Sequence, residues 1–140
     1  VMDGSDVAVI AAGPSVNRAV EAAEMLKNET GKNPAIYNIR YIKPLDTAML
    51  EEIGNGFGRI ITIEDGCING GLYGAVSEFM AGRKCSRPEV TAIGLPDRYI
   101  SQGTQEELRE ECGLTTERIY SAMKGALEKN VKKDEKVLQN

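Results

Sequence analysis

Histidine is missing from this sequence, and its absence excludes more chemistry than any other feature of the composition. Without an imidazole, the chain cannot form a Ser-His-Asp or Cys-His catalytic group, and it lacks a principal zinc ligand. Tryptophan is also absent and aromatic residues make up only 5% of the chain. We therefore do not expect a hydrolase of the histidine-dependent kind, a zinc site or a base-stacking platform.

Other features that the chain lacks bear on its compartment and partners. The three cysteines, Cys67, Cys85 and Cys112, form no C-x-x-C pair, and an odd, scattered set predicts reduced thiols in the cytoplasm. No apolar run approaches the roughly 20 residues that span a bilayer, and the first residues show no signal-peptide pattern. A net charge of −4 disfavours nucleic acid or an anionic membrane as a partner.

Short apolar runs alternate with helical patterns along the chain. Strands are predicted at 7–13, 35–42, 59–64 and 89–96, with amphipathic helical patterns between them. This alternation predicts an α/β fold, a three-layer sandwich with a mainly parallel sheet of four or five strands. We expect one domain over residues 1–128, followed by a charged tail at 129–140 that loses its apolar face and frays.

Several residues signal where helices begin and end. Asp46 is a predicted N-cap and Gly54 a predicted helix end, while Thr104 and Glu107 form a capping box and Gly113 stops that helix. The residues expected to face the core from the later helices are Leu72, Val76, Phe79, Met80, Leu108, Cys112, Met123, Ala126 and Leu127, with Leu114 stapling onto Ile119.

The stretch IEDGCINGGLYGAV, residues 63–76, resembles a phosphate-binding turn between a strand and a helix. The dinucleotide pattern G-x-G-x-x-G fails because Asn69 stands at its first glycine, and the P-loop pattern fails because Leu72 and Tyr73 replace Lys and Ser/Thr. We therefore predict that the glycines turn the chain and let the helix pack close to the sheet. As an alternative, the N–H groups of this helix start could meet an anion supplied by another domain.

The charged and thiol groups near this turn have plain interpretations. Glu64 and Asp65 are adjacent, so they point to opposite faces, and we predict strand-end carboxylates that face solvent. Cys67 is predicted to be a small apolar filler. No catalytic or metal-binding residue is predicted. The candidate anion-facing or interdomain positions are Gly70, Gly71, Gly74, Arg40 and Lys43. For Arg40 and Lys43 we expect a solvated charge pair or an interdomain salt bridge, and the alternative is a cationic rim at the edge of the sheet.

Four stretches carry a resemblance to a known family: DVAVIAAGPSVNRAVEAAEML, NIRYIKPLD, ITIEDGCINGGLYGAVSEF and GLPDRYISQGTQEELREECGLTTERI. In this order, from about residue 4 to about residue 128, the chain resembles the carboxyl-terminal domain of the 1-deoxy-D-xylulose-5-phosphate synthases. KPLD and the glycine turn are shared with transketolases and with 2-oxoacid dehydrogenase β subunits. The segment GLPD…QGTQEEL…GL is the discriminating part.

The resemblance implies a domain of a longer enzyme. Such synthases are cytoplasmic, thiamine-diphosphate-dependent transferases that condense pyruvate with glyceraldehyde 3-phosphate for isoprenoid, thiamine and pyridoxal synthesis. Their first domain binds the diphosphate and magnesium, their second supplies the activating glutamate, and their third supports the assembly and the homodimer.

This chain has only the lookalike Glu64-Asp65-Gly66 of the metal–diphosphate signature, and no asparagine pair follows it. We thus expect an interaction domain that binds no cofactor itself and contacts the two preceding domains of the same polypeptide. The alternatives are the equivalent domain of a transketolase or dehydrogenase β subunit, and a free-standing anion or nucleotide sensor.

Overall fold

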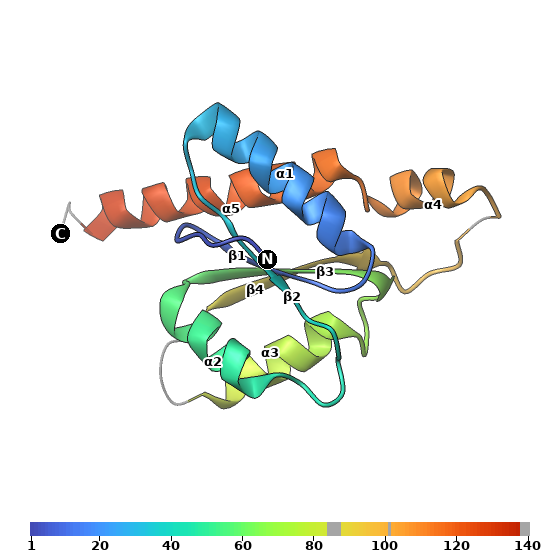
Figure 1. Ribbon diagram of the computed structural model, residues 1–140, viewed down its shortest axis with the longest axis horizontal. Helices are drawn as coiled ribbons and strands as arrows, with labels where there is room; N and C mark the ends of the chain where they lie inside the picture. The colour runs from blue at the N-terminus through green and yellow to red at the C-terminus, as the bar shows by residue number, and fades with distance from the viewer. Residues whose placement is uncertain (84–87, 101, 138–140) are drawn as a thin grey trace.

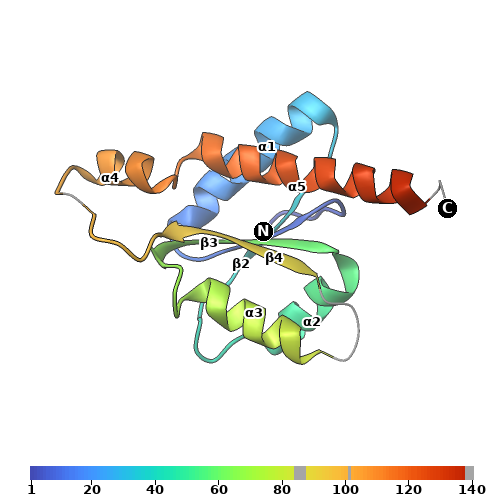
Figure 2. The same ribbon diagram turned by 180° about the vertical axis from the view of Figure 1, so that it is seen from behind.

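A four-stranded parallel sheet forms the centre of the molecule (Figures 1 and 2). The computed structural model describes residues 1–83, 88–100 and 102–137, with side chains described as far as residue 128. Its elements, in chain order, are β1 (Ala8–Ala11), α1 (Ser15–Thr30), β2 (Ala35–Asn38), α2 (Thr47–Gly56), β3 (Arg59–Cys67), α3 (Leu72–Gly82), β4 (Glu89–Leu95), α4 (Gln105–Cys112) and α5 (Thr116–Val137).

The strands lie in the order β2-β1-β3-β4, and every neighbouring pair is parallel. Ala8 of β1 pairs with Ala35 on one side and with Ile60 on the other. An antiparallel bridge joins Met2 to Ile36, so the amino-terminal segment lies against β2. The predicted α/β architecture with a mainly parallel sheet is confirmed.

Helices cover both faces of the sheet, with α1 and α5 on one face and α2 and α3 on the other (Figure 1). The central strand β1 is buried throughout, so its alternating side chains serve both layers: Val9 packs toward α1 and α5, and Ile10 packs toward α2 and α3. The residues that anchor the first core are Leu26, Ile61, Ile119 and Met123, and those of the second are Leu50, Ile53, Leu72 and Val76.

Several element boundaries differ from the sequence-based prediction, and β1 is shorter than the predicted 7–13. β2 ends at Asn38, because only the N–H of Ile39 continues the pairing with β1 before the chain turns away. β3 continues to Cys67 through a register shift after Ile63. The predicted end of α2 at Gly54 is wrong, because the helix runs to Gly56 and Gly54 lies inside it.

The predicted caps at Asp46 and Thr104 and the stop at Gly113 are confirmed, and the staple of Leu114 onto Ile119 stays a prediction. Asp46 accepts a hydrogen bond from the N–H of Met49 at 3.0 Å, and Thr104 and Glu107 form the reciprocal capping box. Gly113 has a left-handed conformation, with φ of 70°, directly after α4. The backbone of α5 is helical to Val137, and the fraying of 129–140 stays a prediction.

A polar cluster on the outer surface joins α1 to α5. Glu29 accepts hydrogen bonds from Tyr120 and from Lys124, the latter at 2.7 Å. Hydrogen bonds from Lys124 and Tyr120 lower the pKa of Glu29 below its ordinary value of 4.5. Since the ionised form is favoured in the folded state, this cluster stabilises the fold above the unfolded-state pKa, and the stabilisation disappears as the pH falls through the lower folded-state pKa.

We predict that Glu29→Gln removes this pH dependence. The wild-type chain should exceed the variant in free energy of unfolding near neutral pH, and the difference should shrink as the pH falls below about 4.5. Urea denaturation of both chains at a series of pH values measures it. A difference that stays constant into acid would contradict the assignment.

Candidate functional site

The carboxyl edge of the sheet is where ligands bind in open parallel α/β folds. Here that edge carries the turns that lead into α1, α2, α3 and α4. At its centre, the buried strand β3 delivers Glu64 and Asp65, which are consecutive residues. Their surroundings show what this edge can bind.

Glu64 is an internal carboxylate that caps helix α3. Its side chain accepts hydrogen bonds from the backbone N–H groups of Leu72, at 3.0 Å, and of Tyr73, at 3.4 Å, and the residue is only 6% exposed. The prediction that Glu64 faces solvent is therefore wrong. The physical reason is that α3 begins after Gly71, which has no side chain to cap it, so a carboxylate from the neighbouring strand satisfies its first N–H groups.

Asp65 points to the opposite layer, as expected for adjacent strand residues. It accepts a hydrogen bond from the Oγ of Ser15, the first residue of α1, at 2.6 Å. It also pairs with Arg18 at 2.5 Å and lies 3.9 Å from Arg109 of α4. Its side chain is 27% exposed, so Asp65 is a partly buried ionic junction between β3, α1 and α4.

The first three helices along the chain therefore each begin beside a carboxylate of the chain itself. Asp65 serves α1 through Ser15, Asp46 serves α2, and Glu64 serves α3. A helix N-terminus attracts anions because its N–H groups and its dipole favour negative charge. Since each of these positions already holds a negative group, the geometry does not favour an incoming phosphate at any of them.

The glycines of the turn have different roles. Gly70 has a φ of +78°, a conformation that favours glycine. A Cβ on Gly71 would lie 2.4 Å from Oε2 of Glu64 and 2.5 Å from the carbonyl oxygen of Cys67. A Cβ on Gly74 would meet nothing within 4 Å. The sharp turn and the close approach are thus located at Gly70 and Gly71, whereas the described residues offer no packing reason for Gly74.

The two predicted cationic residues lie on a different turn. Arg40 and Lys43 are exposed between β2 and α2, and strand β1 lies between β2 and β3 in the sheet. Neither forms an ion pair with any residue that the structure describes. The structure thus places them at the same edge as Gly70, Gly71 and Gly74 but on a separate turn, and an interdomain role for the five stays a prediction.

The cysteines correct one prediction, and the reduced state of all three stays a prediction. Cys67 is exposed, so its predicted role as an apolar filler is wrong, because β3 has already left the core when it reaches this residue. Cys67 and half-buried Cys112 are both free thiols. Cys85 lies outside the described residues.

Metal binding is not supported by the described ranges, which contain no group of three or more His, Cys, Asp or Glu side chains arranged to hold an ion. The magnesium–diphosphate group that the resemblance associates with the longer enzymes does not fit here, since Glu64 occupies the N-terminus of α3 and Asp65 is paired with Arg18. Among the described helices, none is long and apolar enough to cross a membrane.

We predict that inorganic phosphate leaves the turn unperturbed. The Glu64 carboxylate would repel an anion at the start of α3, so the amide resonances of Gly70, Gly71 and Gly74 should not move in a titration to about 10 mM phosphate. Two-dimensional NMR of the labelled chain measures this. Saturable shifts confined to these three amides would instead support the anion-sensor alternative.

Sequence reasoning missed the capping role of Glu64, although a signal was present. A helix pattern that starts after two glycines has no Ser, Thr, Asp or Asn at its own N-cap, so its first N–H groups need a partner from elsewhere. An acidic residue at the end of the preceding buried strand is the nearest candidate in the chain.

The fold and this edge define a class: a parallel α/β domain whose ligand-binding edge is filled by its own carboxylates. The chain belongs to the family described as "Transketolase, C-terminal domain", which it matches over residues 1–119. The family resemblance expected from the four sequence stretches is therefore confirmed.

The most informative relatives are bacterial synthases. The chain is 42% identical over 121 residues to the 1-deoxy-D-xylulose-5-phosphate synthase of Phocaeicola vulgatus, which covers 86% of this chain and 19% of that protein. It is 46% identical over 112 residues to the enzyme of the same name from Bacteroides thetaiotaomicron, covering 80% of this chain and 17% of that protein. The matched region therefore spans less than a fifth of the length of either relative.

Solved structures support the fold. A structure described as "Split gene transketolase, inactive beta4 tetramer" is 31% identical with a TM-score of 0.82, and covers 91% of this chain and 41% of that one. Transketolase from Campylobacter jejuni shares the fold at 16% identity, with a TM-score of 0.63 over 88% of this chain and 17% of that one.

Proposed function

We propose that this chain is the carboxyl-terminal interaction domain of a 1-deoxy-D-xylulose-5-phosphate synthase, and that it supports the assembly without catalysing the reaction itself. The observation that carries the proposal is its identity of 42–46% to synthases of that name over at least 80% of its length. In this proposal the preceding domains of the same cytoplasmic polypeptide bind thiamine diphosphate and magnesium, and the complete enzyme is a homodimer.

The chemistry of the carboxyl edge supports the division of labour. The adjacent carboxylates Glu64 and Asp65 are engaged with α3 and α1 respectively, so they do not form a free acid–base pair. Neither is available to a substrate without breaking contacts that hold the helices. A domain of this kind contributes surface and rigidity, while the reacting groups lie on the other domains of the polypeptide.

The alternative assignment to a transketolase rests on the split-gene transketolase structure, which is 31% identical over most of this chain. The synthases are more similar in sequence, and the sequence segment that discriminates between the two groups, GLPD…QGTQEEL…GL, is present at 94–114. We therefore favour the synthase.

The test uses the complete polypeptide encoded by the gene that contains this chain. We expect it to form 1-deoxy-D-xylulose 5-phosphate from pyruvate and glyceraldehyde 3-phosphate when thiamine diphosphate and magnesium are present. Calorimetry of residues 1–140 alone should show no stoichiometric binding of the cofactor. Transketolase activity in the polypeptide would favour the alternative, and tight cofactor binding by the isolated chain would contradict the proposed division of labour.

A further inference from the structure

Helix α4 projects from the end of the molecule, beyond the sheet that the other helices cover (Figures 1 and 2). All of its residues are described, and none of them is buried. We use the term arm for residues 96–100 together with α4. A helix of eight residues gains little stability from its own hydrogen bonds, so helices this short normally depend on tertiary packing.

Two polar contacts join the arm to the rest of the domain. The side chain of Asn69 donates a hydrogen bond to Asp97 at 3.0 Å, and Arg109 lies 3.9 Å from Asp65. Within the arm, Arg98 pairs with Glu111 at 2.8 Å. These contacts orient the arm, and Leu108, Arg109 and Cys112 of α4 are half-buried, so the domain covers one side of the helix only in part.

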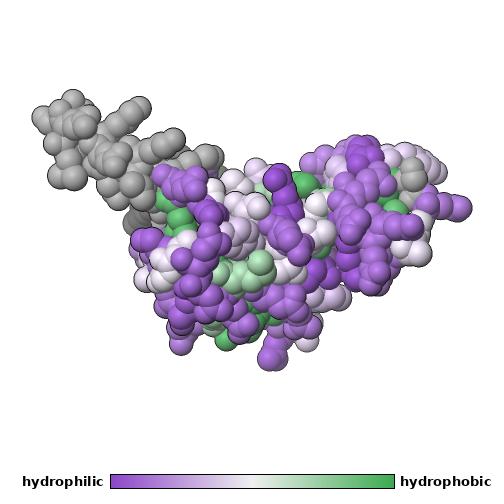
Figure 3. All heavy atoms as spheres, turned by 90° about the horizontal axis from the view of Figure 1, so that it is seen from above, coloured by the Kyte–Doolittle hydropathy of each residue, from purple (hydrophilic) through white to green (hydrophobic). Residues whose placement is uncertain are grey.

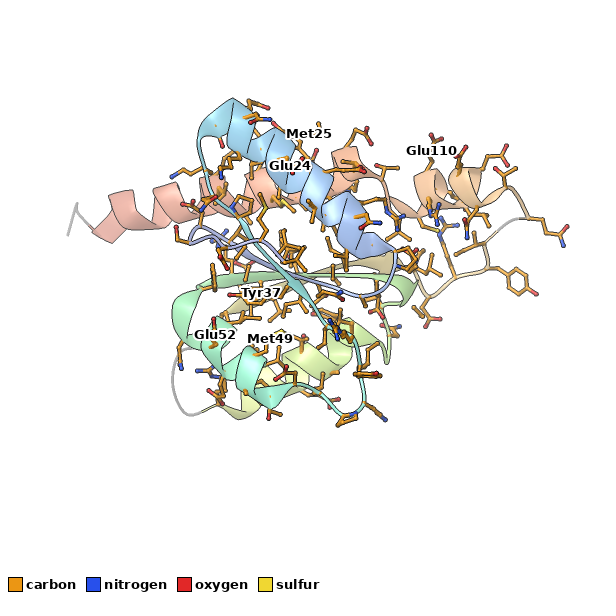
Figure 4. All side chains as sticks on the ribbon, viewed as in Figure 1. Glu24, Met25, Tyr37, Met49, Glu52 and Glu110 are labelled. Carbon is orange, nitrogen blue, oxygen red and sulfur yellow. The ribbon has the colours of Figure 1, made fainter. Side chains whose placement is uncertain are left out.

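The arm presents an acidic face beside an apolar one. Glu106 and Glu110 are exposed one turn apart on α4, and Leu108 and Cys112 are half-buried on a neighbouring side. Tyr99, in the loop before the helix, is fully exposed at 101%. Figure 4 shows Glu110 on the outer side of α4, and Figure 3 shows mainly hydrophilic side chains over the face formed by α1, α4 and α5.

We infer that the arm docks on a basic surface of another domain of the same polypeptide, with Tyr99 as its aromatic anchor. This inference rests on the proposed function, in which the chain is one part of a longer enzyme. More than four-fifths of the length of the synthases it resembles lies outside the matched region, so a partner surface within the polypeptide is available.

Charge identifies the kind of partner. From Pro96 to Cys112 the arm has five carboxylates and two guanidinium groups. Docking against the arm of a second copy would bring like charges together, and the whole chain carries a net charge of −4. A basic surface with an apolar recess is complementary to the acidic face and to the tyrosine, which is a residue type enriched at binding hot spots.

Hydrogen exchange of the complete polypeptide, compared with residues 1–140 alone, tests the inference. Amides of 97–100 and of α4 should exchange at least about tenfold more slowly in the complete polypeptide, because docking suppresses local opening. Tyr99→Ala and Glu110→Lys should each remove this protection without changing the thermal stability of residues 1–140. The matched controls are Met25→Ala and Glu24→Lys, which alter exposed side chains on the outer side of α1 (Figure 4).

Each outcome decides the inference independently of the synthase assay. Equal exchange of the arm amides in the complete polypeptide and in residues 1–140 alone overturns the inference. Protection that persists in both arm variants, or that is lost equally in both control variants, also overturns it. A reading frame without a further domain removes the proposed partner and overturns it as well. Synthase activity with an unprotected arm leaves the proposed function intact, whereas protection without that activity supports docking and contradicts the synthase assignment.

Discussion

Gly71→Ala is expected to destabilise the domain by about 2–4 kcal/mol, although it adds one methyl group. The new Cβ would lie 2.4 Å from Oε2 of Glu64 and 2.5 Å from the carbonyl oxygen of Cys67. Glu64 cannot withdraw without abandoning the N–H groups of Leu72 and Tyr73, and the carbonyl belongs to the backbone. Urea denaturation of the variant measures the loss.

The matched control is Gly74→Ala, three residues further along the same segment. A Cβ there meets nothing within 4 Å, and Gly74 lies inside α3, where alanine is the better helix former. This substitution should stabilise the chain by roughly 0.5–1 kcal/mol. If both substitutions have the same effect, the Glu64 cap does not determine the shape of the turn.

Gly54→Ala should have the next largest effect, a loss of about 2–3 kcal/mol. Its Cβ would lie 1.7 Å from Nη1 of Arg83, whose side chain is only 4% exposed. The guanidinium group donates to the carbonyl oxygen of Glu51 at 3.1 Å and, more weakly, to that of Leu50 at 3.4 Å. Arg83 thus donates to carbonyl groups in the middle of α2, and Gly54 leaves the space for its guanidinium group.

A double-mutant cycle tests this pairing. With Arg83→Met in place, the space beside Gly54 is no longer filled by a guanidinium group, so Gly54→Ala should become neutral or stabilising. Gly56→Ala is the control, because its Cβ meets nothing within 4 Å and its effect should add to that of Arg83→Met within about 0.5 kcal/mol. Additive behaviour of Gly54→Ala as well would contradict the proposed contact.

The sheet and its order of helices could be predicted from the sequence because they depend on periodicity. Apolar runs such as RIITI are typical of buried parallel strands, and the alternation with amphipathic helices leaves few topologies. Helix ends with side-chain caps, at Asp46 and Thr104, were predicted correctly because the capping group is local in the chain.

The sequence-based prediction misses two contacts whose partners lie elsewhere in the chain, although the two glycines before α3 give a signal for one of them. Gly54 has the local appearance of a helix end, yet it lies inside α2 and leaves space for Arg83, the residue directly after α3. Glu64 has the local appearance of a surface carboxylate, yet it caps a helix eight residues away. The roles of Gly54 and Glu64 were predicted from the residues next to them in the sequence. Their actual partners, Arg83 and the first N–H groups of α3, are brought to them by the fold.

The adjacency of Glu64 and Asp65 also restricts how the length of this segment can change. Successive residues of a strand face opposite layers, so inserting or deleting one residue just before this pair would send each carboxylate to the wrong helix. Glu64 would lose α3 and Asp65 would lose α1 in a single step. The contacts of the two carboxylates with α1 and α3 therefore require that β3 keeps a constant length up to Glu64. We expect insertions at this edge of the sheet to fall in the other turns.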